Sequence, residues 1–150
     1  MSGLNIELVG INNLEKRFKN APITLSKEVK LIIDDTIIKI QTKAKQDVPV
    51  GKTSKLKNSI THRLFNFETG GFISAGNANV KYAPYVEFGT GEKFKIPSYS
   101  NLNLSELDEY AATFRRTKKV NLPYRPYLFP ALSTYYNSMI SRIAKATTTI

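Results

Sequence analysis

The segment from Ile23 to Gln46 constrains the fold most, because its residues follow a helical spacing over its whole length. One stripe of this segment is almost entirely apolar and comprises Leu25, Val29, Ile32, Ile33, Thr36, Ile37, Ile40 and Ala44. The opposite side carries Lys27, Lys30, Asp34, Lys39 and Lys43. A helix with so wide an apolar face has to bury it against other elements. We therefore expect a long central helix with a sheet packed around it.

Three segments have the character of strands in an antiparallel sheet. Leu4–Val9 alternates apolar and polar residues, which is typical of a half-buried strand. Thr61–Phe65 and Phe72–Gly76 flank Gly70-Gly71, a pair that favours a hairpin turn. A further turn is expected at Asn77-Ala78-Asn79.

The stretch Tyr82–Thr90 is predicted to be a fourth strand. Its tyrosines, valine and phenylalanine suit a half-buried pleated surface, Pro84 suits the start or edge of a strand, and Gly89 ends it. Glu87 lies among these apolar residues, where an ionised carboxylate is costly unless it meets a partner or backbone donors, or lies at an exposed edge. We expect Arg125 or a lysine to be that partner.

The remaining segments predict helices. Ile11–Phe18 has the spacing of a short helix, and Leu104 to Phe114 predicts another, with Ser105 as its N-cap and a basic cluster after its end. A terminal helix is expected to begin near Pro126 or Pro130 and to run to about Lys145. With no internal repeat or Gly/Ser linker, residues 1–150 predict one α+β domain: a small antiparallel sheet around a long central helix, a C-terminal helix, and an inserted short helix within 91–121.

Composition narrows the classes of protein. The 150 residues include no cysteine, which excludes disulfides and Cys-based metal sites. No apolar run approaches the length of a membrane helix, and Met1–Asn5 lacks the features of a signal peptide, so we expect no membrane association and synthesis in the cytoplasm.

The sequence gives little support for catalysis, a cofactor or a metal. Gly51-Lys52-Thr53 lacks the earlier glycine of a phosphate-binding loop, because position 46 is glutamine. Asp34 and Asp35 are adjacent on a helix and cannot face one another. A hydrolase built on Glu87 and the single histidine, His62, is the weakest of the functional alternatives. We expect a protein that is not an enzyme.

The net charge of +10 is concentrated in two places. Lys43 to Lys57 carries five lysines and one acid, Asp47, and a second cluster spans Arg115 to Lys119. Such a surplus can meet phosphates, acidic protein surfaces or only water. A basic, sequence-independent nucleic-acid-binding module therefore stays open as an alternative function.

Three blocks together resemble the head-tail joining family of tailed phages, the neck or tail-completion proteins of the gene-product-ten type in HK97-like siphophages. The first runs from Asp47 to Ile60, the second is Tyr82–Thr90, the most distinctive, and the third is Arg125–Leu132. The stretch from Gly91 to Asn121 is longer than the family's usual link between the second and third blocks. The order of the blocks, with the long helix before them and the terminal helix after them, covers nearly the whole chain.

The resemblance implies a structural virion protein of the neck. It implies a closed ring, a hexamer, that joins the head-side portal and adaptor proteins to the tail-side terminator and tube proteins and lets genomic DNA pass. For the ring contacts we expect Tyr82, Tyr85, Glu87, Phe88, Arg125, Tyr127 and Phe129 as interface residues. For non-specific contact with DNA in the lumen we expect Lys43, Lys45, Lys52, Lys55 and Lys57.

Overall fold

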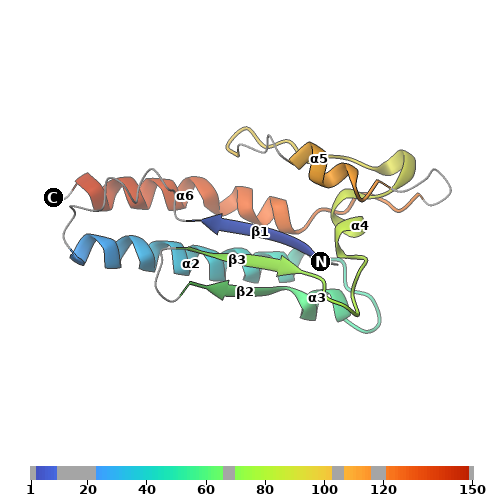
Figure 1. Cartoon of the computed structure of the whole chain (residues 1–150), viewed down its shortest axis with the longest axis horizontal. Coiled ribbons are helices and arrows are strands. Elements are labelled where there is room, and N and C mark those ends of the chain that lie inside the picture. The colour runs from blue at the N-terminus through green and yellow to red at the C-terminus, as the bar shows by residue number, and fades with distance from the viewer. Residues whose placement is uncertain (1–2, 10–22, 66–69, 103–106, 116–120, 149–150) are drawn as a thin grey trace.

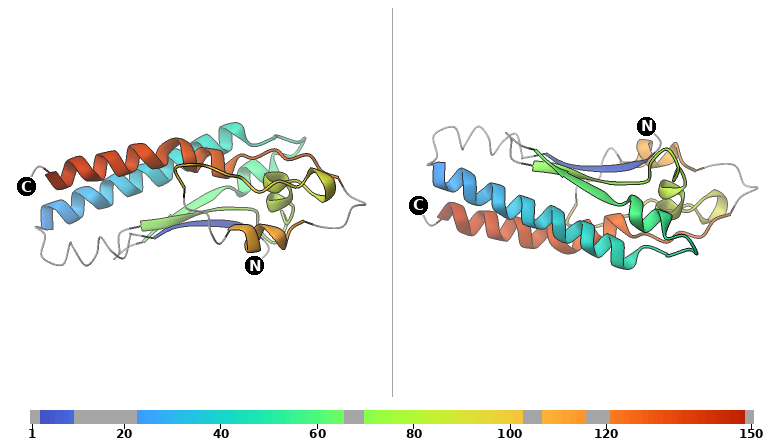
Figure 2. Two further views of the ribbon diagram at one scale, coloured as in Figure 1. Left: turned by 90° about the horizontal axis from the view of Figure 1, so that it is seen from above. Right: turned by 90° about the horizontal axis from the view of Figure 1, so that it is seen from below.

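The chain folds into two layers, a three-stranded sheet on a pair of long helices (Figure 1; Figure 2). The structure is a computed structural model that describes residues 3–9, 23–65, 70–102, 107–115 and 121–148. Its elements in chain order are β1 (Leu4–Val9), α2 (Ile23–Asp47), α3 (Lys55–Ser59), β2 (Thr61–Leu64), β3 (Gly70–Ala75), α4 (Ala83–Phe88), the 3-10 helix η1 (Gly91–Lys93), α5 (Leu107–Ala112) and α6 (Leu128–Thr148). The α+β fold expected from the sequence is confirmed.

The sheet is antiparallel, with strand order β1-β3-β2. β3 lies in the centre, where Ile73 pairs with Ile6 of β1 and with His62 of β2. The hairpin between β2 and β3 is as predicted, but the turn was placed wrongly. Gly70 and Gly71 belong to β3, where both pair with β1, and the residues that connect the strands, 66–69, lie outside the described ranges.

Gly71 of β3 allows β2 to lie close beside it and leaves room for the Ile37 side chain of α2. A Cβ built on Gly71 would lie 2.4 Å from the carbonyl oxygen of Arg63 and 2.9 Å from Cδ1 of Ile37. Both contacts are shorter than real Cβ atoms make, and the first is with backbone that cannot move without breaking the β2–β3 pairing. A glycine in a strand is typical of such a close approach.

The core lies between the sheet and the two long helices. Ile37 and Ile40 of α2, Ile73 of β3 and Leu128 of α6 are fully buried there. The sheet covers one face of the α2–α6 pair, so α2 is not enclosed on all sides (Figure 2). Leu31 and Ile38 on another face of α2 remain 68% and 45% exposed.

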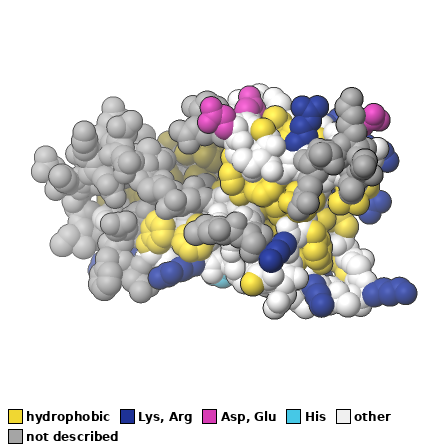
Figure 3. Space-filling model, turned by 45° about the vertical axis from the view of Figure 1, so that its right-hand side comes forward, with side chains coloured by type: hydrophobic (Ala, Val, Ile, Leu, Met, Phe, Trp, Pro, Cys, Tyr) yellow, Lys and Arg dark blue, Asp and Glu magenta, His cyan; other side chains and the backbone are white. Residues whose placement is uncertain are grey.

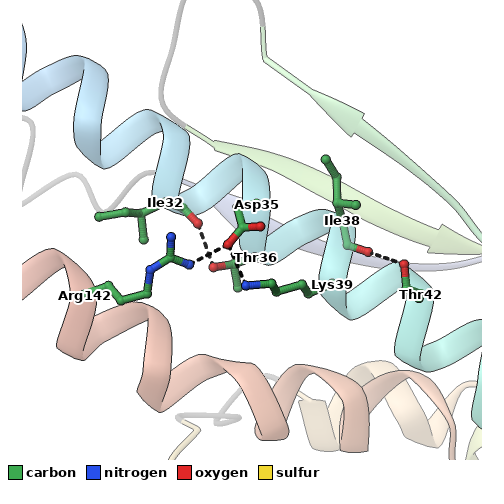
Figure 4. A network of polar contacts seen from close by, with 7 residues as sticks. All are labelled: Ile32, Asp35, Thr36, Ile38, Lys39, Thr42 and Arg142. Atoms are coloured by element: carbon green, nitrogen blue, oxygen red, sulfur yellow. Dashed lines mark hydrogen bonds and ion pairs between the residues drawn. The ribbon is translucent and has the colours of Figure 1, made fainter.

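A polar contact joins the two long helices (Figure 4). Arg142 of α6 donates from Nη1 to the Asp35 carboxylate at 2.6 Å, and Lys39 donates to the same oxygen at 2.9 Å. Asp34, next to Asp35 in sequence, instead accepts from Lys30 at 2.9 Å. The two aspartates therefore point in different directions, as the sequence predicts.

The prediction of a strand at Tyr82–Thr90 was wrong, because Ala83–Phe88 forms the helix α4. Proline is tolerated in the first turn of a helix as well as at the start of a strand, and Pro84 occupies that turn. Of the two shorter predicted helices, the one within the insertion is confirmed as α5. Its proposed cap, Ser105, and the other predicted helix, Ile11–Phe18, lie outside the described residues.

Candidate functional site

Glu87 of α4 forms the N-terminal cap of α6. Its Oε2 accepts hydrogen bonds from the backbone N–H groups of Tyr127 and Leu128 at 2.8 and 3.0 Å. Its Oε1 accepts from the backbone N–H of Phe129 at 2.9 Å. The first N–H groups of a helix have no partner within the helix, and an anion there also interacts favourably with the helix dipole. We call this arrangement of Glu87 and the three N–H groups the Glu87 cap.

The Glu87 cap replaces the ion pair predicted from the sequence. Glu87 is fully buried, whereas Arg125 is exposed and joins α4 through its backbone, donating to the carbonyl of Val86 at 3.0 Å. Burial raises the pKa of the Glu87 carboxyl, and the three backbone donors act in the opposite direction by favouring its charged form. The sequence analysis names backbone donors as one of the environments that this carboxylate can occupy. The fold provides this environment.

Three further hydrogen bonds tie α4 and the residues just after it to the segment before α6. The backbone N–H of Thr90 donates to the carbonyl of Leu122 at 3.1 Å, and the N–H of Leu122 donates to Oγ1 of Thr90 at 2.8 Å. The Tyr127 hydroxyl donates to the carbonyl of Ala83 at 3.2 Å from a fully buried ring. These contacts close the 91–121 insertion into a loop whose two ends meet at α4.

Aromatic rings fix the insertion on α4. The ring of Phe88 lies between Phe114 and Phe129, with centroid distances of 6.1 and 5.9 Å. Phe114 also meets Tyr85 edge-on at 5.9 Å. Aromatic pairs at such distances stabilise beyond the area that they bury. α5, which precedes Phe114, is therefore held in place on the body of the protomer.

The structure divides the predicted interface residues into two groups. Glu87, Phe88, Tyr127 and Phe129 are buried inside the protomer, so they build the joint between α4 and α6 and are not surface anchors. Tyr82 is 42% exposed, Arg125 is exposed and Tyr85 is half-buried, so these three remain on the surface.

The lysines predicted to face DNA surround the end of α2 and α3. Lys52, Lys55 and Lys57 are exposed, and Lys45 is half-buried. Lys43 differs from them, because its Nζ lies 2.8 Å from the carboxylate of Asp47, and this hydrogen bond raises the pKa of Lys43. Within the described part of the chain, none of the other four forms a salt bridge.

His62 and Glu87 belong to separate hydrogen-bond networks. His62 lies exposed on β2, with Nδ1 2.6 Å from Oε1 of Gln41 on α2. Two shallow pockets, one between α2 and α6 and one beside Pro97 and Tyr99, contain neither residue among their lining side chains. Among the described residues no group of three or more His, Cys, Asp or Glu side chains is arranged to hold a metal ion.

The sequence contains a signal for the Glu87 cap, although the sequence analysis predicted an ion pair for Glu87. The start of α6 follows Arg125-Pro126-Tyr127, which offers no Ser, Thr, Asp or Asn to cap the helix. The backbone N–H groups at an uncapped helix start need acceptors, and an ionised acid in an apolar segment needs donors. A contact between the two satisfies both needs and can be predicted from the sequence.

Comparison with protein families gives one match. The family model described as "Bacteriophage HK97-gp10, putative tail-component" matches residues 11–89, more than half of the chain. The match includes α2, α3, the sheet strands β2 and β3, and α4 with Glu87, but not the residues that donate to Glu87. No curated protein and no solved structure matches. In the described ranges, no helix is both long enough and apolar enough to cross a bilayer.

Proposed function

The chain belongs to the HK97-gp10-like family of phage tail components, and from this premise we propose that it is a structural protein of the virion neck. In this proposal, copies of the chain form a ring between head and tail and do not catalyse a reaction. The ring joins the portal and adaptor proteins of the head to the terminator and tube proteins of the tail.

The observation that supports the proposal is that residues of the Tyr82–Thr90 motif make their contacts inside the protomer. Its one carboxylate has both oxygens occupied by three backbone N–H groups, and its Phe88 is fully buried. A buried carboxylate with no room for a substrate supports a role in rigidity rather than in chemistry. A rigid protomer suits a ring, because closure requires the same contact angle at each interface.

Six copies are proposed on the basis of the family resemblance stated above. Tyr82 and Arg125 are the candidates for contacts with neighbouring proteins, since both are exposed beside the Glu87 cap. Tyr and Arg are enriched among residues that contribute most to binding at interfaces.

A positively charged lumen is the second part of the proposal. DNA of any sequence passes such a ring, and lysines attract its phosphates without reading the bases. The exposed Lys52 and the half-buried Lys45 support this role, whereas Lys43 supports it less because Asp47 already neutralises it.

Sedimentation of the purified chain in low and high salt, with and without DNA, tests the proposal. Self-association that persists in high salt, or binding to purified tail components, supports the neck role. A chain that stays monomeric and binds DNA with a steep salt dependence contradicts it and supports a basic nucleic-acid-binding module instead. The exposed lysines around α3 are the observation that favours this second candidate.

A further inference from the structure

Exposed acids lie at one edge of the sheet and exposed lysines at the other, although Arg115, three residues after α5, is also exposed. β1 and β2 are the edge strands, because β3 lies between them. α5 lies beyond the β1 edge, and α3 leads directly into β2 at the other edge (Figure 1). We call these the α5 edge, with Asp108 and Glu109, and the α3 edge, with Lys55 and Lys57.

The acids of the α5 edge are presented outward by a helix that is fixed on its other side. Leu107 and Ala111 are buried, whereas Asp108 and Glu109 are exposed. Tyr110 holds α5 near the start of β1, with its hydroxyl 3.4 Å from the carbonyl oxygen of Gly3. Neither acid forms a salt bridge within the described part of the chain.

The lysines of the α3 edge are presented in the same way. Leu56 and Ser59 are buried, and the hydroxyl of Ser59 accepts from the N–H of Gly76 at 2.9 Å, which fixes α3 to the end of β3. Lys55 and Lys57 are exposed on the other side of this short helix, and Arg63 is exposed on the neighbouring β2.

The surface shows where the carboxylates gather. On the face shown in Figure 3, the carboxylates lie along the upper margin, where Lys and Arg side chains are also present, and the charged side chains along the lower margin are Lys and Arg. A chain with a net charge of +10 repels its own copies. Contact between copies is therefore favoured where opposite charges meet.

We propose that the α5 edge of one copy binds the α3 edge of the next copy. The occupant of each edge is then a second copy of this chain, because the two surfaces are complementary in charge and lie on opposite sides of one protomer. A contact between two different surfaces is heterologous, and such contacts close into a ring when the rotation between copies allows it. This inference rests on the proposed neck function and names the contact that builds the ring. It assigns Lys55 and Lys57 to a neighbouring protein rather than to DNA.

Reversal of each edge tests the contact. One variant carries Asp108→Lys and Glu109→Lys, and the other carries Lys55→Glu and Lys57→Glu. Like charges then face each other in both variants, so we expect each to self-associate at least tenfold more weakly than the wild type in analytical ultracentrifugation. A variant with Lys27→Glu and Lys145→Glu, exposed lysines of α2 and α6, controls for the change in net charge and is expected to associate as the wild type does.

Mixing the two reversed variants provides the sharper measurement. Each variant then offers the other a complementary edge, so association is expected to return in the mixture, and also in a single chain that carries all four reversals. Circular dichroism verifies that each variant is folded. Mixtures that stay as weakly associated as the separate variants contradict the contact.

The absence of cysteine permits a covalent version of the test. A chain with Lys57→Cys and Glu109→Cys is expected to give a ladder of multimers with a short bismaleimide cross-linker, whereas each single variant stops at the dimer. Wild-type association that neither reversal weakens, with no ladder, overturns this contact and leaves the neck function standing. A wild-type chain that assembles neither with itself nor with tail components overturns both.

Discussion

The carboxylate of Glu87 accepts a hydrogen bond at 2.9 Å from the backbone N–H of Phe129, which lies 42 positions later in the sequence. This contact joins the end of the segment that matches the family to the start of the C-terminal helix. The two segments fit together in the fold, although only the first lies within the matched residues 11–89. Each supplies what the other lacks, a buried anion on one side and free helix N–H groups on the other.

Replacement of Glu87 is expected to weaken this joint strongly. Glu87→Ala leaves three buried N–H groups without an acceptor and should lower the free energy of unfolding by about 1–3 kcal/mol, the typical cost of leaving buried donors unsatisfied. Glu87→Gln retains one acceptor oxygen and should cost less than Glu87→Ala. Urea denaturation measures both. Glu28→Gln, a change at an exposed acid of α2, is the control, and a Glu87→Ala protein as stable as this control would show that the cap contributes nothing.

The hydroxyl of Tyr127 should make a smaller contribution to the same joint. Tyr127→Phe keeps the buried ring but removes the donor to the carbonyl of Ala83. We expect a loss of about 1 kcal/mol in the free energy of unfolding. Thermal denaturation followed by circular dichroism checks this value, and an unchanged midpoint would mean that the hydroxyl bond carries no net stability.

Gly89 is expected to tolerate no side chain. Its φ is 70°, and a Cβ would lie 2.6 Å from the carbonyl oxygen of Lys93. Gly89→Ala should therefore destabilise the fold by about 1–3 kcal/mol, the usual cost of a strained backbone position. Gly51→Ala is the matched control, because no heavy atom lies within 4 Å of a Cβ at that position. Equal denaturation midpoints for the two variants would refute the steric argument.

The contact between Asp35 and Arg142 should contribute a small, pH-dependent stability. Hydrogen bonds from Lys39 and Arg142 lower the pKa of Asp35 below the ordinary value of an aspartate. A lowered pKa in the folded state contributes stability that is present above the unfolded pKa and is lost as the pH falls through the folded pKa. The Asp35 side chain is 40% exposed, so solvent screens the pair and the contribution should stay below about 1 kcal/mol.

Denaturation of the wild type and of Arg142→Met between pH 6 and pH 2 measures this contribution. We expect the wild type to lose more stability than the variant as the pH falls below the ordinary range of an aspartate. Parallel curves would indicate that Arg142 does not affect the ionisation of Asp35.

The long-range apolar pattern of the sequence predicts most of the fold. The stripe along α2 and the alternation in β1 arise from burial on one side of an element, and the spacing of residues records this directly. The terminal helix was predicted for the same reason, and it begins at Leu128, between the two prolines that were considered as its start.

The apolar pattern did not predict the structure of short segments. α4 has six residues, too few to distinguish helical from strand spacing, and its proline suits the first turn of a helix and the start of a strand equally well. Gly70-Gly71 has the composition of a turn, but the close approach of the Arg63 carbonyl of β2 requires glycine at position 71 of β3. In both cases tertiary contacts decide the local structure.

The candidate surfaces were only partly predictable for a related reason. The aromatic residues of Tyr82–Thr90 and Arg125–Leu132 suit an interface or a core equally well, and only the fold shows that Phe88, Tyr127 and Phe129 are internal. The opposition of the α5 and α3 edges could not be predicted, because it depends on which strands lie at the edges of the sheet.

Electron microscopy of tailed particles that contain this chain tests the central claim most directly. The account predicts a closed ring of density at the junction of head and tail, into which copies of the two-layer protomer fit side by side with the α5 edge of each against the α3 edge of the next. Particles in which this chain is absent from the junction, or present there only as isolated copies, would contradict it.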